Sequence, residues 1–267
     1  MIKPDAPTAR WRESVTIQRR VVWALFLRES LTRFGRGNLG FLWLFLEPAL
    51  FTVGITAFWT LTKSVHGSSL PIVPFAITGY SSVLLWRNMP ARLVKAVESN
   101  VGLMHHRNVR LIDVYIARLL LEIGGVSMSF MFLTLTFWAV GWTDLPEDLV
   151  TVLAGWALLV WFGSALAIFV GTLSEKSDLV ERLWHPVTYF LFPLSGAAFI
   201  VDALPTNMQE LILWLPMVNC TEIIREGFFG SIFTAHYDVG YLMLANSVLT
   251  LAGLMNTASI SRRIVLE

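Results

Sequence analysis

The residues of this sequence best placed to do chemistry are charges that stand inside long apolar segments. Arg118 and Glu122 are four residues apart, a spacing that places both on one face of a helix. Glu47, which precedes Pro48, has no charged neighbour in the sequence. A charge left alone in lipid is costly, so each is a functional candidate. We predict an ion pair between Arg118 and Glu122, with a transport site as the alternative. For Glu47, a contact to a neighbouring helix and a place in a substrate path both stay open.

Motifs for nucleotide, metal or hydrolytic chemistry are missing or weak. The chain has no Gly-x-x-x-x-Gly-Lys phosphate-binding loop, so we expect no ATP hydrolysis by this chain alone. His105 and His106 are adjacent, and adjacent helical residues do not face one metal ion. The single cysteine, Cys220, excludes an intrachain disulfide and a multi-cysteine metal site. We therefore expect no catalytic residue, no metal site and no cofactor bound by this chain.

The composition is typical of a membrane protein. Of 267 residues, 55% are hydrophobic and only 15% are charged, which excludes a soluble domain of this size. The net charge of +1 gives no reason to expect a nucleic-acid partner. We predict an all-α polytopic membrane protein.

Six apolar segments are long enough, or nearly so, to cross a hydrocarbon core of ~30 Å as helices. They are residues 39–61, 71–89, 111–142, 149–173, 183–200 and 239–260. The segments between them alternate in charge. Those on the side of the N-terminal segment (1–38) and the tail (261–267) carry most Lys and Arg, whereas the other loops hold only Lys63 and Arg225. The positive-inside rule then places both termini in the cytoplasm.

An amphipathic helix is expected at the end of the N-terminal segment 1–38. Trp23, Leu27, Leu31 and Phe34 recur on one face at helical spacing, and charged residues share the opposite face. This pattern favours a helix that lies in the membrane interface, with a cytosolic packing helix as the alternative.

The segment between the fifth and sixth spans, residues 201–238, holds two apolar runs that are too short to cross a bilayer. Pro205 and Pro216 bound the first run, and the second covers residues 218–229. Short runs of this kind are typical of re-entrant helices, whose connecting backbone is buried in protein or lines a cavity. We predict outer re-entrant half-helices here.

Small residues and deep aromatic rings have simpler explanations. Gly163 and Gly171, with Ala167 between them, form a stripe at helical spacing that predicts close helix packing. Tyr80, Trp161 and Tyr189 lie deeper than the interfacial belt, where each ring either stacks on a sugar or fills space.

Three stretches, in order along nearly the whole chain, are similar to those of a known family. Residues 33–48 read RFGRGNLGFLWLFLEP, residues 100–122 read NVGLMHHRNVRLIDVYIARLLLE, and residues 193–216 end in Leu-Trp-x-Pro. They resemble the ABC-2 type permeases of the capsular polysaccharide exporter family. The family tends to have prolines where this chain has Asn108 and Leu111. We therefore expect the third helix to begin earlier here.

The resemblance implies the transmembrane subunit of an ATP-driven exporter. Such a subunit forms a homodimer and pairs with a separate ABC nucleotide-binding ATPase, which would hold the ATP and Mg. It would move a lipid-linked acidic capsular polysaccharide across the bacterial inner membrane, with periplasmic and outer-membrane export proteins as further partners. Export of another glycolipid (O-antigen or teichoic acid) or of a drug is the alternative, and an intramembrane enzyme or scaffold is a more remote one.

The resemblance also implies where the ATPase docks. A short coupling helix would cover residues 97–106, with the loop 174–182 as a second contact. The coupling residues would be Glu98, Asn100, Leu103, Met104, His105, Ser174 and Asp178.

Candidates for the substrate path are the deep aromatic residues, Glu47, and arginines near the inner mouth. The arginines would attract an anionic lipid head or polymer, although ordinary anionic membrane lipid explains the same charges. The full set is Arg33, Arg36, Glu47, Tyr80, Arg107, Arg110, Trp161 and Tyr189.

Overall fold

The computed structural model describes residues 7–34, 40–62, 70–100, 102 and 109–264. Within these ranges every regular element is a helix, which confirms the predicted all-α class. The longer helices are α1 (Pro7–Phe34), α2 (Gly40–Thr62), α3 (Ile72–Leu93), α5 (Leu111–Ala139), α6 (Leu149–Ser174), α7 (Asp178–Leu191), α9 (Pro216–Phe229) and α10 (Val239–Ile264). The shorter ones are η1 (Glu98–Asn100), η2 (Val201–Ala203), α8 (Thr206–Ile212) and η3 (Gly230–Ile232).

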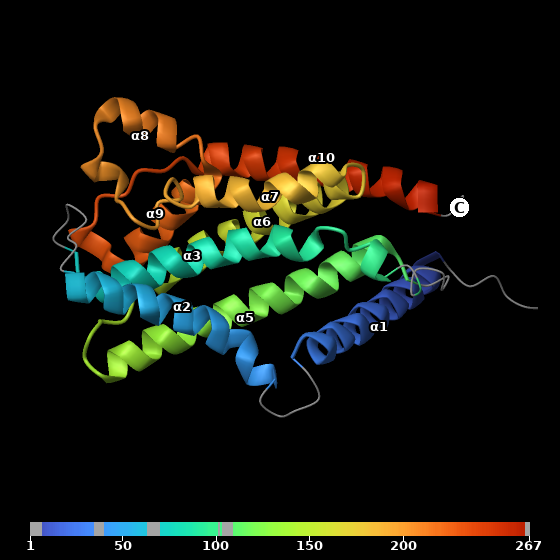
Figure 1. Cartoon of the computed structure of the whole chain (residues 1–267), viewed down its shortest axis with the longest axis horizontal. Coiled ribbons are helices and arrows are strands. Elements are labelled where there is room, and N and C mark those ends of the chain that lie inside the picture. Colours follow the sequence, from blue (N-terminus) through green and yellow to red (C-terminus); the bar gives the residue numbers. More distant parts are fainter. Residues whose placement is uncertain (1–6, 35–39, 63–69, 101, 103–108, 265–267) are drawn as a thin grey trace, which may run out of the picture.

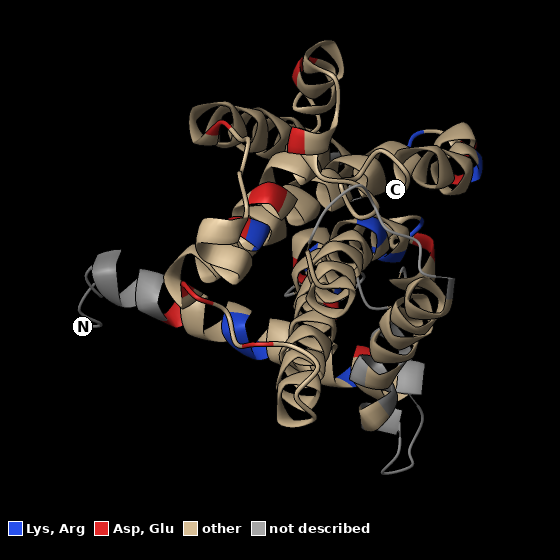
Figure 2. Cartoon of the chain, turned by 90° about the vertical axis from the view of Figure 1, so that its left-hand side faces the viewer, with Lys and Arg blue, Asp and Glu red and all other residues tan. Residues whose placement is uncertain are grey.

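Three of the described helices are long and apolar enough to cross a membrane, namely α5, α6 and the part Val239–Ser261 of α10. Figure 2 looks at the molecule from the left-hand end of Figure 1 and shows few Lys, Arg, Asp or Glu residues on the long ribbons. The chain is therefore a polytopic membrane protein, as predicted. In addition, α2 contains a shorter apolar stretch, Ala49–Leu61.

The long helices lie roughly side by side, with α3 in contact with α2, α5, α6, α7 and α9 (Figure 1). At one end of this bundle lie α8, α9 and the connection between α5 and α6; we call it the α8 end. At the opposite end lie α1, the turn between α6 and α7 and the C-terminal part of α10; we call it the α1 end.

The predicted small-residue stripe of α6 packs against α3. A Cβ atom added to Gly171 would lie 2.8 Å from the Cβ of Leu93 and 3.1 Å from its carbonyl oxygen. One added to Gly163 would lie 2.8 Å from Met89 Sδ, and Ala167 between the two glycines is fully buried. The stripe therefore lets the two helices approach closely, which is the packing interpretation of the sequence.

The N-terminal helix α1 has two apolar faces. Leu25 is buried and packs with Val114 and Ala117 of α5. Trp23 and Leu27, which belong to the apolar stripe found in the sequence, are exposed. The helix thus packs on the bundle through one face and leaves the second apolar face open, so the interfacial and packing interpretations each describe one side of it.

The predicted fifth span, residues 183–200, is not one helix. Helix α7 begins at Asp178 and ends at Leu191, and residues 192–200 form turns. Pro193 has no N–H to continue a helix, and Gly196 has φ +79°, a conformation that favours glycine. The loop 174–182, predicted as a second ATPase contact, is likewise mostly helical, because only residues 175–177 separate α6 from α7.

Helix α9 is buried although it carries charges. It has 14 residues, too few to cross a bilayer, and it packs against α6 and α3. The Arg225 side chain is fully buried; its Nη1 donates to the carbonyl of Phe199 at 2.8 Å and its Nη2 donates to that of Ala197 at 3.1 Å. Arg225 thereby satisfies main-chain carbonyls of the turns that follow α7.

Close neighbours complete the surroundings of Arg225. Its guanidinium lies 3.9 Å from the ring centroid of Phe75. A Cβ atom on Gly79 would lie 2.9 Å from Arg225 Nη2 and 2.7 Å from the carbonyl oxygen of Ala197, so only glycine leaves room here. Glu222, one turn earlier on α9, is fully buried and accepts a hydrogen bond from the main-chain nitrogen of His236 at 3.2 Å.

The contact between α6 and α3 gives a stability prediction. We expect Gly171→Ala to lower the midpoint of thermal unfolding, because the new methyl group meets the backbone of Leu93 and overpacking of this kind costs roughly 1–3 kcal/mol. Gly124→Ala on α5 is the control, since a Cβ there meets nothing within 4 Å. The measurement is thermal unfolding of the detergent-solubilised protein. Equal midpoints for the two variants would show that the stripe is not closely packed.

Candidate functional site

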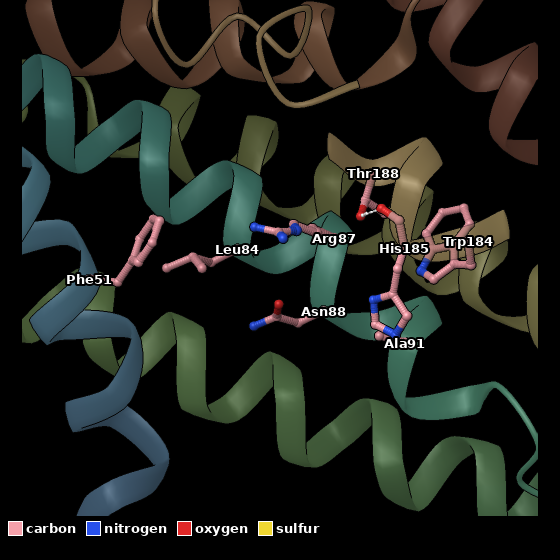
Figure 3. Close-up of a pocket in the computed structure, with 8 residues that line it drawn as sticks. All are labelled: Phe51, Leu84, Arg87, Asn88, Ala91, Trp184, His185 and Thr188. Atoms are coloured by element: carbon pink, nitrogen blue, oxygen red, sulfur yellow. Dashed lines mark hydrogen bonds between the residues drawn. The ribbon is translucent and has the colours of Figure 1, made fainter. Parts of the chain in front are cut away.

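A groove with polar and apolar lining lies between α2, α3 and α7. It has a volume of about 310 Å³ and is lined by Phe51, Leu84, Arg87, Asn88, Ala91, Trp184, His185 and Thr188 (Figure 3). The α3 residues recur every three or four positions and so share one face of that helix. His185 and Thr188 are similarly spaced on α7. Figure 3 shows Phe51 at one end of the groove and His185 with Trp184 at the other.

Arg87 is the cation of the groove. Its guanidinium carbon lies 5.0 Å from the ring centroid of Tyr189, a cation–π contact. The residue is half-buried, and Tyr189 itself is 66% exposed. Arg87 thus lines the groove, and among the described residues the aromatic ring of Tyr189 contacts its guanidinium.

Two further polar side chains, those of Asn88 and His185, line the groove. Trp184 beside them is buried, and its indole nitrogen is also buried and has no hydrogen-bond partner within the part of the chain that the structure describes. Asn88 is half-buried beside Arg87. With the imidazole of His185, which is exposed, the groove combines N–H donors with one positive charge. Such a set binds anionic and hydroxyl groups, and it lacks a pair of nucleophile and base within reach of each other.

The predicted aromatic candidates of the substrate path have different surroundings. Tyr189 lies beside the groove through its contact with Arg87. Tyr80 is buried, and its ring lies 5.2 Å from that of Trp59 and 5.7 Å from that of Phe192, which are packing contacts. Trp161 faces another helix, because its indole N–H donates to Thr250 Oγ1 on α10 at 2.9 Å. Tyr189 thus lies beside the groove, whereas Tyr80 and Trp161 are not among the residues that line it.

Arg110 is the one predicted charged candidate whose side chain the structure describes, and it is not among the residues that line the groove. Arg110 is exposed at the start of α5, where its main-chain nitrogen donates to Asp113 Oδ2 at 2.9 Å. The side chains of Arg33 and Glu47, and Arg36 and Arg107 as a whole, lie outside the described residues.

A second polar region is the junction, residues 94–100, which follows α3 at the α1 end. Lys95 has φ +52°, an uncommon conformation for a residue with a side chain. Its ammonium group lies 2.6 Å from Asp178 Oδ1 and 3.1 Å from Glu98 Oε1. The hydrogen bonds to Asp178 and Glu98 raise the pKa of Lys95, and the bond to Lys95 lowers the pKa of Asp178. The junction is thus tied to the start of α7.

Two of the residues predicted to contact an ATPase are buried instead. Ser174 is fully buried, and its hydroxyl accepts the Lys95 main-chain N–H at 3.1 Å. Asn100 is 2% exposed; its amide oxygen accepts from Arg28 Nη1 at 2.8 Å, and its amide nitrogen donates to the Ala96 carbonyl at 2.9 Å. Both residues hold the backbone of the junction, because a tight turn leaves main-chain groups without helical partners.

The remaining coupling residues divide into two groups. Glu98 and Asp178 are exposed at the α1 end, where a partner protein can reach them. Leu103, Met104 and His105 lie outside the described residues.

Arg118 and Glu122, predicted as an ion pair, each have a charged partner on another helix. Arg118 Nε lies 3.3 Å from Glu29 Oε1 on α1, and Arg118 Nη1 donates to the Arg92 carbonyl at 2.8 Å. Glu122 accepts from Arg92 Nε at 3.1 Å. The spacing rule considers only one helix, and partners on α1 and α3 lie outside its reach.

The site residues that the sequence analysis missed are Arg87, Asn88, Trp184 and His185 of the groove, and the buried charges Glu222 and Arg225. Arg87 falls at the end of the predicted second span, 71–89, and its charge was taken as part of the basic segment that follows, whereas α3 continues to Leu93. Arg225 was counted as a loop residue. Its position within the apolar run 218–229 was the signal that would have marked it as an intramembrane charge.

The sequence comparisons agree with this arrangement of helices. The profile of the ABC-2 type transporter family matches residues 20–229, which include the groove and the junction. The chain belongs to this family. It is therefore a multi-pass transmembrane component of a transporter.

Several curated relatives match nearly the whole chain. The capsule polysaccharide export inner-membrane protein CtrC of Neisseria meningitidis serogroup B is 40% identical over 96% of this chain and 96% of its own length. BexB of Haemophilus influenzae, which has the same description, is 36% identical over 95% of this chain and 96% of its own. The polysialic acid transport protein KpsM of Escherichia coli is 28% identical over 91% and 94%.

Glu175 at the junction gives a prediction about pH. Its carboxylate accepts the Val97 N–H at 2.9 Å, and burial raises the pKa of this carboxyl above the usual 4.5. A raised pKa favours the protonated form in the folded state, so this contribution to stability is present below pH ~4.5 and is lost as pH rises through the folded-state pKa. We expect Glu175→Gln, which keeps an acceptor for Val97, to unfold at a higher temperature than the parent at pH 7, with a smaller difference at pH 5.

Glu181→Gln, at an exposed position on α7, is the matched control for this prediction. It should leave the midpoint of thermal unfolding unchanged at both pH values. If Glu175→Gln instead unfolds at a lower temperature than the parent at pH 7, the charged carboxylate stabilises the junction and the argument fails.

Proposed function

We propose that this chain is the permease subunit of an ATP-driven exporter that moves a lipid-linked, anionic capsular polysaccharide across the bacterial inner membrane. The observation that carries the proposal is the 40% identity, over 96% of both chains, to a capsule polysaccharide export inner-membrane protein. The groove supports it independently, since Arg87 and neighbouring N–H donors suit the carboxylates and hydroxyls of an acidic sugar.

The proposed orientation places the α1 end in the cytoplasm and the α8 end outside, with six spans and both termini inside. In support, Lys95, Arg28 and Arg118 cluster at the α1 end, as the positive-inside rule requires of a cytoplasmic face. Helices α8 and α9 would then be the outer re-entrant elements before the last span. The groove, near the C-terminal half of α3, opens in the half of the bundle toward the cytoplasm.

The proposed energy source is a separate ABC ATPase subunit, which would hold ATP and Mg, whereas this chain would bind no cofactor. The junction favours this arrangement, because Lys95 and Glu175 link it to α6 and α7 while Arg28 links it to α1. A movement of residues 97–106 caused by the ATPase would therefore be transmitted to α1, α6 and α7. Glu98 and Asp178 would face the ATPase directly.

A homodimer would complete the groove. Tyr189 and Phe190 on α7 and Phe51 on α2 are exposed beside it, so one wall of the groove is open. A second copy packed against these helices would close that wall and exclude lipid from the polymer. We infer that periplasmic and outer-membrane export proteins receive the polymer beyond the α8 end.

Export should depend on the charge of Arg87. We expect Arg87→Ala to reduce surface polysaccharide strongly, because the groove loses its cation, and Arg87→Lys to restore part of it, because the charge returns without the bidentate geometry. The measurement is surface and intracellular polymer in cells that carry each variant at equal membrane abundance. Arg20→Ala, at an exposed position on α1, is the control and should export normally. Normal export by Arg87→Ala would remove the groove from the substrate path.

Coupling to an ATPase is tested by co-purification. We expect the chain to show no ATP hydrolysis alone and to co-purify with a nucleotide-binding subunit.

A second test introduces an acidic residue at position 103 or 104. We expect Leu103→Glu or Met104→Glu to abolish export without loss of membrane insertion, because a charge there would destabilise an apolar docking contact. Robust hydrolysis by the purified chain without a partner, or undiminished export by both charged variants, would contradict this part of the proposal.

A further inference from the structure

A second cavity lies at the α8 end, away from the groove. Its volume is about 520 Å³, within the ~300–1,000 Å³ range of small-ligand sites. Residues from four segments of the chain line it: α8, the turn before α9, α9 itself, and the chain from residue 237 into α10. Its character is opposite to that of the groove, because its lining combines aromatic rings with carboxylates and has no Lys or Arg.

The aromatic rings of this cavity are held in fixed positions. Tyr241 Oη donates to the Trp214 carbonyl at 2.6 Å, and the two rings pack edge to face with centroids 5.8 Å apart. Tyr237 Oη donates to Glu226 Oε2 at 2.7 Å. Trp214 nevertheless remains 71% exposed. A large ring that is fixed by its neighbours and still open is a ready stacking surface, since little ordering entropy is lost on binding.

The polar lining supplies acceptors beside these rings. Glu210 is exposed at the rim. Asp238 Oδ1 accepts the Tyr241 N–H at 2.9 Å, which leaves the second carboxylate oxygen open to a ligand. The side chain of Asn219 already binds main-chain groups of other residues. Its amide oxygen accepts the Asp238 N–H at 2.9 Å, and its amide nitrogen donates to the Leu213 carbonyl at 2.7 Å. The cavity therefore offers acceptors to hydroxyl donors and repels anions.

We propose that this cavity binds a neutral pyranose unit of a saccharide. The axial C–H groups of a pyranose form an apolar face that stacks on Trp214, and its hydroxyls donate to Glu210 and Asp238. This inference rests on the proposed function, which it deepens: anionic units of the polymer are held at Arg87, and neutral units at the α8 end as the polymer leaves. Two sites of opposite charge along one path select a polymer that alternates both kinds of unit.

The test is hydrogen–deuterium exchange of the full chain in lipid nanodiscs, with chitotriose as a neutral probe and a trimer of sialic acid as an acidic one. Chitotriose is expected to slow exchange in residues 206–214 and 236–242, and the acidic trimer to do so far less. Trp214→Ala should raise the half-saturating concentration of chitotriose at least about tenfold, which corresponds to ~1.4 kcal/mol. Trp142→Ala, an exposed tryptophan outside the cavity, should leave it unchanged.

The outcomes separate this inference from the proposed function. Protection that is absent in the parent, that persists unchanged in Trp214→Ala, or that is stronger with the acidic trimer overturns the neutral-sugar site. None of these results alters the expected export defect of Arg87→Ala, which is measured in cells. Conversely, normal export by Arg87→Ala together with Trp214-dependent protection would overturn the groove as the path and leave a saccharide site at the α8 end.

Discussion

The α8 end of the molecule depends on the hydrogen bonds of one guanidinium to main-chain carbonyls. Where α7 stops, residues 192–200 run through the bundle without a helix, and backbone at that depth must find its partners within the protein. Arg225 bonds to the carbonyls of Ala197 and Phe199, and Gly79 leaves the space for this contact. Glu222 on the same helix is also fully buried and accepts a hydrogen bond from the main-chain nitrogen of His236. The two helices joined in this way also line the cavities: α7 contributes Trp184, His185 and Thr188 to the groove, and α9 contributes Asn219 to the cavity at the α8 end.

Much of the fold was predictable because most of the long helices correspond to one continuous apolar run in the sequence. Span length and composition depend only on residues that are neighbours in sequence, so α6 and α10 begin where the sequence predicted. The predicted span 183–200 differs from the structure because the sequence stays apolar through residues 192–200, although the helix ends at Leu191. Pro193 and Gly196, which has a positive φ, follow that end. Hydropathy measures the environment of a segment, and it does not report whether the backbone there is helical.

The site was less predictable, since its residues meet only in three dimensions. Arg118 pairs with Glu29 on α1, a residue that is remote in sequence. Ser174 and Asn100 were expected to contact an ATPase from the family resemblance, and the structure shows that both are buried partners of main-chain groups, which motif similarity does not reveal. The groove joins segments from α2, α3 and α7, and no local spacing of residues marks such a meeting.

The contact between Arg87 and the ring of Tyr189 has a consequence for movement. An arginine locked to a carboxylate in a dry site is slow to exchange partners, because each separation exposes two charges. An arginine resting on an exposed aromatic face gives up less when it turns toward another group. Such a residue can pass from one unit of a chain to the next with small barriers between them. In the proposed exporter, the contact with Tyr189 would therefore let Arg87 release one unit of the polymer and bind the next with a small energy barrier.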